Sequence, residues 1–165
     1  YNGKEEARFL KILNKHNIGP KLIDYDEKTN QLTMEFVDGK RIQDYFEDAS
    51  KKEIIKQIEL ILNQLYIMDT LKINKLELTN PYKHIIITKQ NKITKPIMID
   101  FERCIYTENP KNITQFIQYL CSSKLGYLFE KKKIQINKDV LRTIAKEYKN
   151  NYNKKYLKKI IKELH

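Results

Sequence analysis

The chain has 165 residues, 41% of them hydrophobic, which suits one domain with its own core. Its net charge of +11 favours polyanionic partners such as nucleic acid, nucleotides or acidic protein surfaces, although lysines on the solvent faces of helices account for the same composition. The two cysteines lie far apart without CxxC spacing, so we expect no disulfide framework, no zinc site and a reducing cytoplasm. No signal peptide or long apolar run appears, so we expect no membrane association.

The amino-terminal part of the sequence predicts a helix, a hairpin and a second helix. Apolar residues at helical spacing over residues 7–13 predict an amphipathic helix that Gly19-Pro20 ends. Two β-prone runs, residues 21–25 and 31–37, flank a polar turn and predict an antiparallel hairpin. A further helix is expected at residues 41–48.

The rest of the chain predicts a long helix, a second hairpin and a helical end. Ser50 precedes a dense apolar pattern at helical spacing over residues 51–72, which indicates a central helix. The runs HIIIT and KPIMID predict a hairpin that ends at Asp100. From Asn112, taken as an N-cap, the sequence is helical, with Gly126 predicted as a break. The fold class is therefore α+β.

The segment KPIMIDFERC, residues 95–104, places Asp100 and Glu102 directly behind an apolar run. Magnesium prefers hard oxygen ligands, and a protein supplies one or two carboxylates beside waters and phosphates. An aspartate that ends a buried strand would present such an oxygen at a cleft. Asp100 is therefore the best candidate metal ligand, and the alternative is an aspartate that caps the following turn.

Three short motifs and the order of elements resemble a known family. The order resembles the protein-kinase-like fold from its regulatory helix onward, and the details are similar to the predicted archaeal serine/threonine protein kinases. The motifs of that family are Asp-Phe-Glu-Arg, Pro-x-Lys-His and Asn-x-Thr-Gln. They match residues 100–103, 81–84 and 112–115, and the resemblance covers most of the chain.

The resemblance implies a protein-kinase-like fold, with a partial N-lobe at residues 1–39 and a helical C-lobe at residues 40–165. It implies an ATP-dependent phosphotransferase, a serine/threonine protein kinase, with ATP and Mg²⁺ as cofactors and a protein or small molecule as phospho-acceptor. A monomer is the default. The family's glycine-rich loop and strand lysine would precede Tyr1 and are not among these residues.

The resemblance also assigns roles to single residues. Asp100 would bind Mg²⁺, with His84 as a second ligand, although a strand-start histidine commonly makes a structural hydrogen bond instead. Glu77 would be the catalytic base, and Lys83 would neutralise a phosphate. A solvated carboxylate is the alternative for Glu77.

Two further assignments concern ATP. Glu6 would orient the upstream lysine, and the backbone of Glu35, Phe36 and Val37 would face adenine. The alternative function is a catalytically inactive kinase-like scaffold whose basic surface binds RNA or an acidic protein partner. Salt-sensitive binding of nucleic acid without affinity for ATP would distinguish this alternative.

Overall fold

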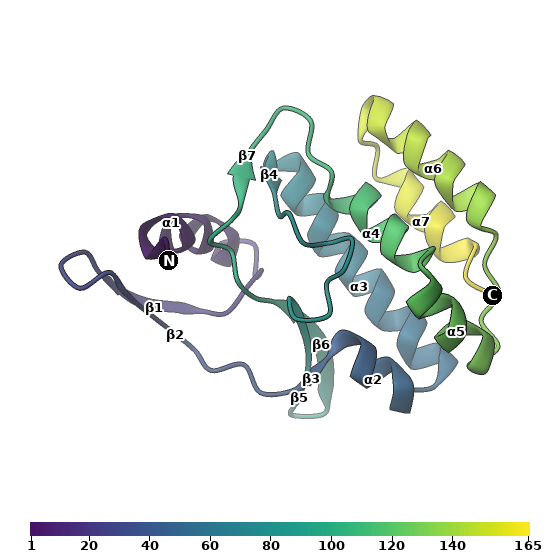
Figure 1. Ribbon diagram of the computed structural model, residues 1–165, viewed down its shortest axis with the longest axis horizontal. Coiled ribbons are helices and arrows are strands. Elements are labelled where there is room, and N and C mark those ends of the chain that lie inside the picture. The colour runs from purple at the N-terminus through teal and green to yellow at the C-terminus, as the bar shows by residue number, and fades with distance from the viewer.

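A computed structural model describes all residues, 1–165. Its amino-terminal part is the helix α1 (Gly3–Asn14) packed on a two-stranded antiparallel hairpin, β1 (Leu22–Asp26) and β2 (Gln31–Met34). Figure 1 shows this hairpin extending away from the rest of the molecule. The predicted helix and hairpin are confirmed, although the helix ends at Asn14, before Gly19-Pro20, and the second strand ends three residues earlier than the 31–37 run suggested.

The long helix α3 (Lys51–Thr70) runs through the middle of the molecule (Figure 1). It begins with a capping box, in which Ser50 and Glu53 each accept a hydrogen bond from the other's backbone N–H. Its apolar face, including Ile58, Ile61 and Leu65, is fully buried in one contiguous core. The dense apolar pattern therefore predicted both the helix and its central position.

A three-stranded antiparallel sheet lies beside α3. Its strands are β3 (Lys40–Arg41), β5 (Ile85–Gln90) and β6 (Ile93–Met98), in the order β3-β5-β6, and α2 (Ile42–Asp48) follows β3 directly. Two glutamine side chains of α3 fix the sheet to the helix: Gln57 donates to the Thr94 carbonyl and Gln64 to the Pro96 carbonyl. The second predicted hairpin is confirmed as β5 and β6.

A pair of very short strands was not predicted. The strand β4 (Ile73–Asn74), just after α3, pairs antiparallel with β7 (Ile105–Tyr106). Strands of two residues show no alternation that a sequence pattern could reveal. This pairing brings the loop after β4 close to the segment that follows Asp100.

Four helices complete the chain: α4 (Asn112–Leu120), α5 (Ser123–Lys131), α6 (Lys138–Asn151) and α7 (Lys155–Lys162). The helix α4 packs against both α3 and α6, while α6 and α7 lie at the far side of the molecule from α1 (Figure 1). The fold is thus α+β, with seven helices and small antiparallel sheets. None of the helices has the length and apolar character needed to cross a membrane.

Two predictions about helix ends are wrong. Gly126 lies inside α5 rather than at a break, because Ser122 caps this helix and Leu125, Leu128 and Phe129 bury its apolar face. Asn112 is not an N-cap: Lys111 holds that position without a side-chain hydrogen bond. The Asn112 side chain instead donates to Asp69 and to the Ile73 carbonyl, because it is buried between α3 and β4.

Candidate functional site

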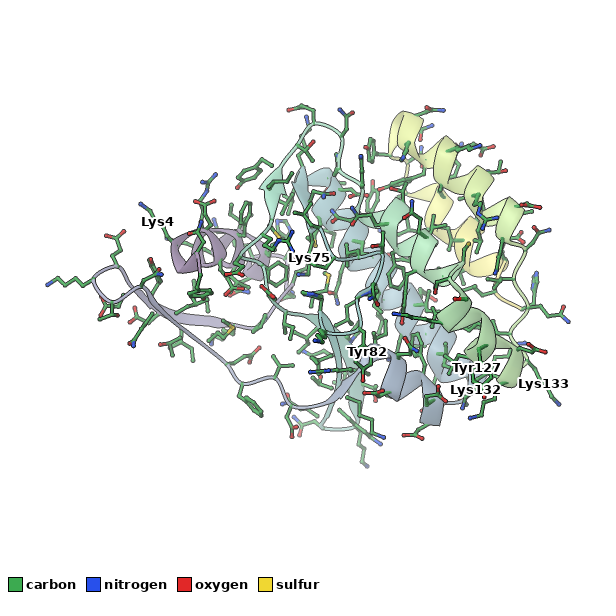
Figure 2. All side chains as sticks on the ribbon, viewed as in Figure 1. Lys4, Lys75, Tyr82, Tyr127, Lys132 and Lys133 are labelled. Carbon is green, nitrogen blue, oxygen red and sulfur yellow. The ribbon has the colours of Figure 1, made fainter.

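Lys75, just after β4, is the centre of the candidate site and is fully buried. Figure 2 shows it in the middle of the molecule, whereas Lys4, Lys132 and Lys133 lie at the periphery. Its Nζ donates to the carbonyl of Asp100 and lies 3.2 Å from Glu77 Oε2 and 3.4 Å from His84 Nδ1. The ammonium also lies 5.1 Å from the centre of the Phe101 ring. Lysines are almost never fully buried without partners, and these contacts replace the lost hydration.

Glu6, in the first turns of α1, approaches the same segment from the opposite side. Its side chain is buried, and Oε2 accepts a hydrogen bond of 2.6 Å from the backbone N–H of Phe101. The other oxygen accepts from the Tyr1 hydroxyl at 2.9 Å, and burial with the Glu6 charge raises the pKa of Tyr1 to about 12. The predicted pairing of Glu6 with an upstream lysine remains a prediction.

Asp100 adopts the left-handed conformation, with φ of +67°. This conformation is uncommon for a residue with a side chain and persists where neighbouring contacts hold it. Here Lys75 binds the carbonyl of Asp100 and Glu6 binds the next N–H. The Asp100 side chain remains 47% exposed, and His84 Nδ1 lies 3.9 Å from its Oδ2. The backbone is therefore fixed while the carboxylate is accessible.

His84 directly precedes β5 and lies beside this carboxylate. Burial and the neighbouring charge of Lys75 lower its pKa, which favours the neutral imidazole. Because an ammonium can only donate, Nδ1 accepts from Lys75 and the ring proton lies on Nε2. In this arrangement neither nitrogen offers a free lone pair to a metal, so the geometry does not favour His84 as a ligand.

Glu77 lies between two cations. Oε2 is 3.2 Å from Lys75 Nζ and Oε1 is 4.0 Å from Arg103 Nη1, and the side chain is only 14% exposed. The alternative of a fully solvated carboxylate is thus wrong for Glu77, because the loop folds back over Lys75. Glu102 does not join this group of charges, and its Oε2 accepts a hydrogen bond from the backbone N–H of Asn2.

An open hollow of about 610 Å³ adjoins His84. The exposed Lys83 lines it, together with Lys124 from α5 and polar residues of α2 and the β4–β5 loop. One wall is formed by Tyr82, whose hydroxyl donates to Asp44 Oδ2 at 2.8 Å while the Arg41 guanidinium lies 5.2 Å from its ring. A ligand of this hollow would lie next to His84 and would face two lysines.

The residues predicted to face adenine lie outside this cluster, in the connection between β2 and β3. Glu35 continues the hairpin: its backbone N–H donates to the Lys21 carbonyl, and its Oε1 accepts from the Lys21 N–H. Phe36 is 87% exposed, and Val37 is half-buried. No hydrogen bond or ion pair joins these three residues to Asp100 or Lys75, and their role in binding adenine remains a prediction.

A buried polar network behind the site was not predicted from the sequence. Asp69, near the end of α3, accepts hydrogen bonds from the N–H and side-chain amide of Asn112, from the Ile113 N–H and from the Tyr148 hydroxyl. Asn112 Oδ1 in turn accepts from the backbone N–H of Lys75 at 2.9 Å. Burial is the largest influence on Asp69 and raises its pKa to about 6. The network therefore anchors the start of the loop after β4 to α3, α4 and α6.

Comparisons with known proteins do not assign the chain to a family. A scan of protein families finds no match, and a search of characterised proteins finds none either. No cluster of three or more His, Cys, Asp or Glu side chains that could hold a metal ion is present. What the structure offers is one accessible carboxylate on a fixed backbone, beside a neutral imidazole and a glutamate held by two cations.

Proposed function

We propose that the protein is an ATP-dependent phosphotransferase of the protein-kinase-like class that transfers phosphate to a serine or threonine hydroxyl. The observation that supports this most is the state of Asp100. Its main chain is held on both sides by buried charged residues, Lys75 and Glu6, and its carboxylate is left accessible. Backbone conformations of this kind, held in place by their surroundings, cluster at functional sites.

The donor set suits magnesium. The Asp100 carboxylate makes no hydrogen bond within the chain, so its oxygens are free to bind a cation. Mg²⁺ is commonly held by one or two carboxylates, with waters and substrate phosphates as the other ligands, so a cluster of three protein ligands is not required. Bound there, Mg²⁺ would neutralise charge on the transferred phosphate.

In this proposal the chain's own residues position the acceptor and the base. Glu77 accepts the proton of the attacking hydroxyl, and Lys75 and Arg103 hold its side chain in place. Lys83 and Lys124 line the hollow beside His84, where they attract the phosphate or an acidic acceptor.

The second candidate is a scaffold without catalysis. The observation that favours it is the pairing of Glu77 with Lys75 and Arg103. Each oxygen of the Glu77 carboxylate faces a cation, so neither oxygen is free to accept the proton of a substrate hydroxyl. A chain with this arrangement and no affinity for ATP would bind partners through its surface alone.

Calorimetry of ATP binding by the full-length protein, with and without Mg²⁺, tests the proposal. We expect Mg²⁺ to strengthen binding in the parent protein and the Asp100→Asn variant to lose at least roughly tenfold in affinity, because the metal ligand is lost. The matched control is Asp24→Asn, an exposed aspartate of β1, which should bind as the parent does. Absence of Mg²⁺-dependent binding in the parent would favour the scaffold.

A further inference from the structure

A run of exposed, unpaired lysines lies on the last helix. Between Tyr148 and Lys162 the chain carries six lysines and no acidic residue. Five of them are exposed on or next to α7, and we name these the α7 lysine patch: Lys154, Lys155, Lys158, Lys159 and Lys162. None of the five takes part in an ion pair.

The patch faces a groove between α7 and α3. This groove, of about 680 Å³, is lined by four of the five lysines and by a single carboxylate, Glu59. On the other side of α7 a hollow of about 480 Å³ contains Lys159 and Lys162, but there three carboxylates, Asp139, Glu147 and Glu163, offset their charge. The uncompensated charge is therefore directed toward the α3 side.

The composition of the patch indicates the kind of partner. Three large apolar residues of α7, Tyr156, Leu157 and Ile160, are buried, and Ile161 in the groove is only partly exposed, so the exposed face offers no large apolar or aromatic anchor. Protein–protein interfaces are depleted in lysine and depend on buried aromatic, arginine or apolar anchors. The exposed lysines therefore suit a polymer that carries regularly spaced negative charges and binds without such anchors. Nucleic acid, with its phosphate backbone, is a polymer of this kind.

The geometry also indicates how such a polymer would bind. Lys154, Lys158 and Lys162 follow one another at four-residue spacing, which is about 6 Å along a helix axis, and all three line the groove. Lysine acts on phosphate as a point charge and lacks the rigid fork with which arginine reads guanine. We propose that the α7 lysine patch binds the phosphate backbone of nucleic acid without sequence preference, in the groove between α7 and α3. This proposal does not depend on the phosphotransferase activity.

The test measures the affinity of the full chain for a fluorescent single-stranded RNA of about 20 nucleotides, by anisotropy, between about 50 and 200 mM salt. The triple variant Lys154→Gln, Lys155→Gln and Lys158→Gln removes three charges of the groove. We expect its affinity at the lower salt to fall at least roughly tenfold. The negative slope of log K against log salt should become shallower by about 2, because each phosphate contact contributes about −0.7 to that slope.

A matched control removes the same charge elsewhere. Lys89, Lys92 and Lys95 are exposed, unpaired lysines on the β5–β6 hairpin, and their triple change to Gln should reduce affinity by less than roughly threefold. Glu59→Gln, which removes the one carboxylate of the groove, should strengthen binding. Circular dichroism and the melting temperature check that each variant is folded.

Three results would overturn the proposal. The first is equal weakening by the two triple variants, which would mean that binding reflects net charge alone. The second is competition by polyglutamate as strong as that by unlabelled RNA, which would indicate an acidic protein partner instead. The third is the absence of RNA binding by the parent at the lower salt.

Discussion

Glu6 and Lys75 bind opposite ends of the same peptide unit. Glu6 accepts the N–H of Phe101, and Lys75 donates to the carbonyl of Asp100. Both side chains are buried, and they come from segments far apart in the chain. A buried peptide group and a buried charge each need a hydrogen-bond partner. Here the peptide group between Asp100 and Phe101 and the two charged side chains provide those partners for one another. The conformation of Asp100 is thus tied to the packing of α1 against the loop after β4.

Lys75→Met should destabilise the fold. The change removes the donor to the Asp100 carbonyl and one of the two cations beside Glu77. We expect the free energy of unfolding to fall by about 2–4 kcal/mol, measured by chemical denaturation. Lys72→Met is the matched control, because Lys72 is exposed and its pairing with Glu108 is at the surface, and it should change the free energy by less than about 0.5 kcal/mol. Equal effects of the two changes would contradict a special role for Lys75.

Glu6→Ala should expose the Phe101 amide to exchange. The carboxylate is the only acceptor of this N–H, so its removal should accelerate hydrogen exchange at Phe101 by roughly tenfold or more relative to the amides of α3. Glu5→Ala provides the control, since Glu5 is half-buried and pairs only with the exposed Arg8. Uniform acceleration at all amides would instead mean general destabilisation.

From the sequence it was possible to predict some of the residues that belong to the candidate site, but not which contacts they make with one another. Asp100 was identified because a carboxylate directly after an apolar run is visible in a linear pattern, whereas Glu77 was identified only through the resemblance to the kinase family. Their environments were not visible. The pairing of β4 with β7 places Lys75 in the interior, and in the sequence Lys75 has the pattern of a solvated loop residue.

Asp69 is a second example of a residue whose environment could not be predicted from the sequence. It lies near the end of an apolar helix, where a single polar residue is compatible with solvent exposure, and only the packing of α4 and α6 on α3 buries it. Its partners Asn112 and Tyr148 lie more than 40 residues away, so no local spacing connects them. Long-range polar networks of this kind depend on tertiary structure and leave no periodic signal.

Gly126→Ala should stabilise the protein. Gly126 lies inside α5, and a Cβ there would meet no atom within 4 Å. Alanine has the higher helix propensity, so we expect a gain of about 0.5–1 kcal/mol in the free energy of unfolding. Gly39→Ala is the contrasting change: its Cβ would lie 2.2 Å from the Ile87 carbonyl oxygen, so it should destabilise the pairing of β3 with β5. Destabilisation by both changes would show that α5 tolerates no added side chain.

The stability of the protein should depend on the protonation of Asp69. Burial raises the pKa of Asp69 from 3.8 to about 6 in the folded chain. At a pH between these two pKa values, Asp69 is deprotonated in the unfolded chain and still protonated in the folded chain. Unfolding then releases a proton, so a rise in pH favours the unfolded state. The stabilisation from a protonated Asp69 is fully present below about pH 4 and is lost as pH rises through about 6.

Asp69→Asn isolates this effect, because the amide does not titrate and every other group is shared. As pH falls from 7 to 4, we expect the free energy of unfolding of the wild type to rise by about 3 kcal/mol relative to that of Asp69→Asn. A pKa difference of about two units corresponds to about that free energy. Denaturation curves at several pH values measure the difference, and Asp24→Asn on the exposed β1 should show no such trend. The opposite slope would mean that the four donors to Asp69 outweigh its burial, in which case the folded chain would hold the carboxylate charged.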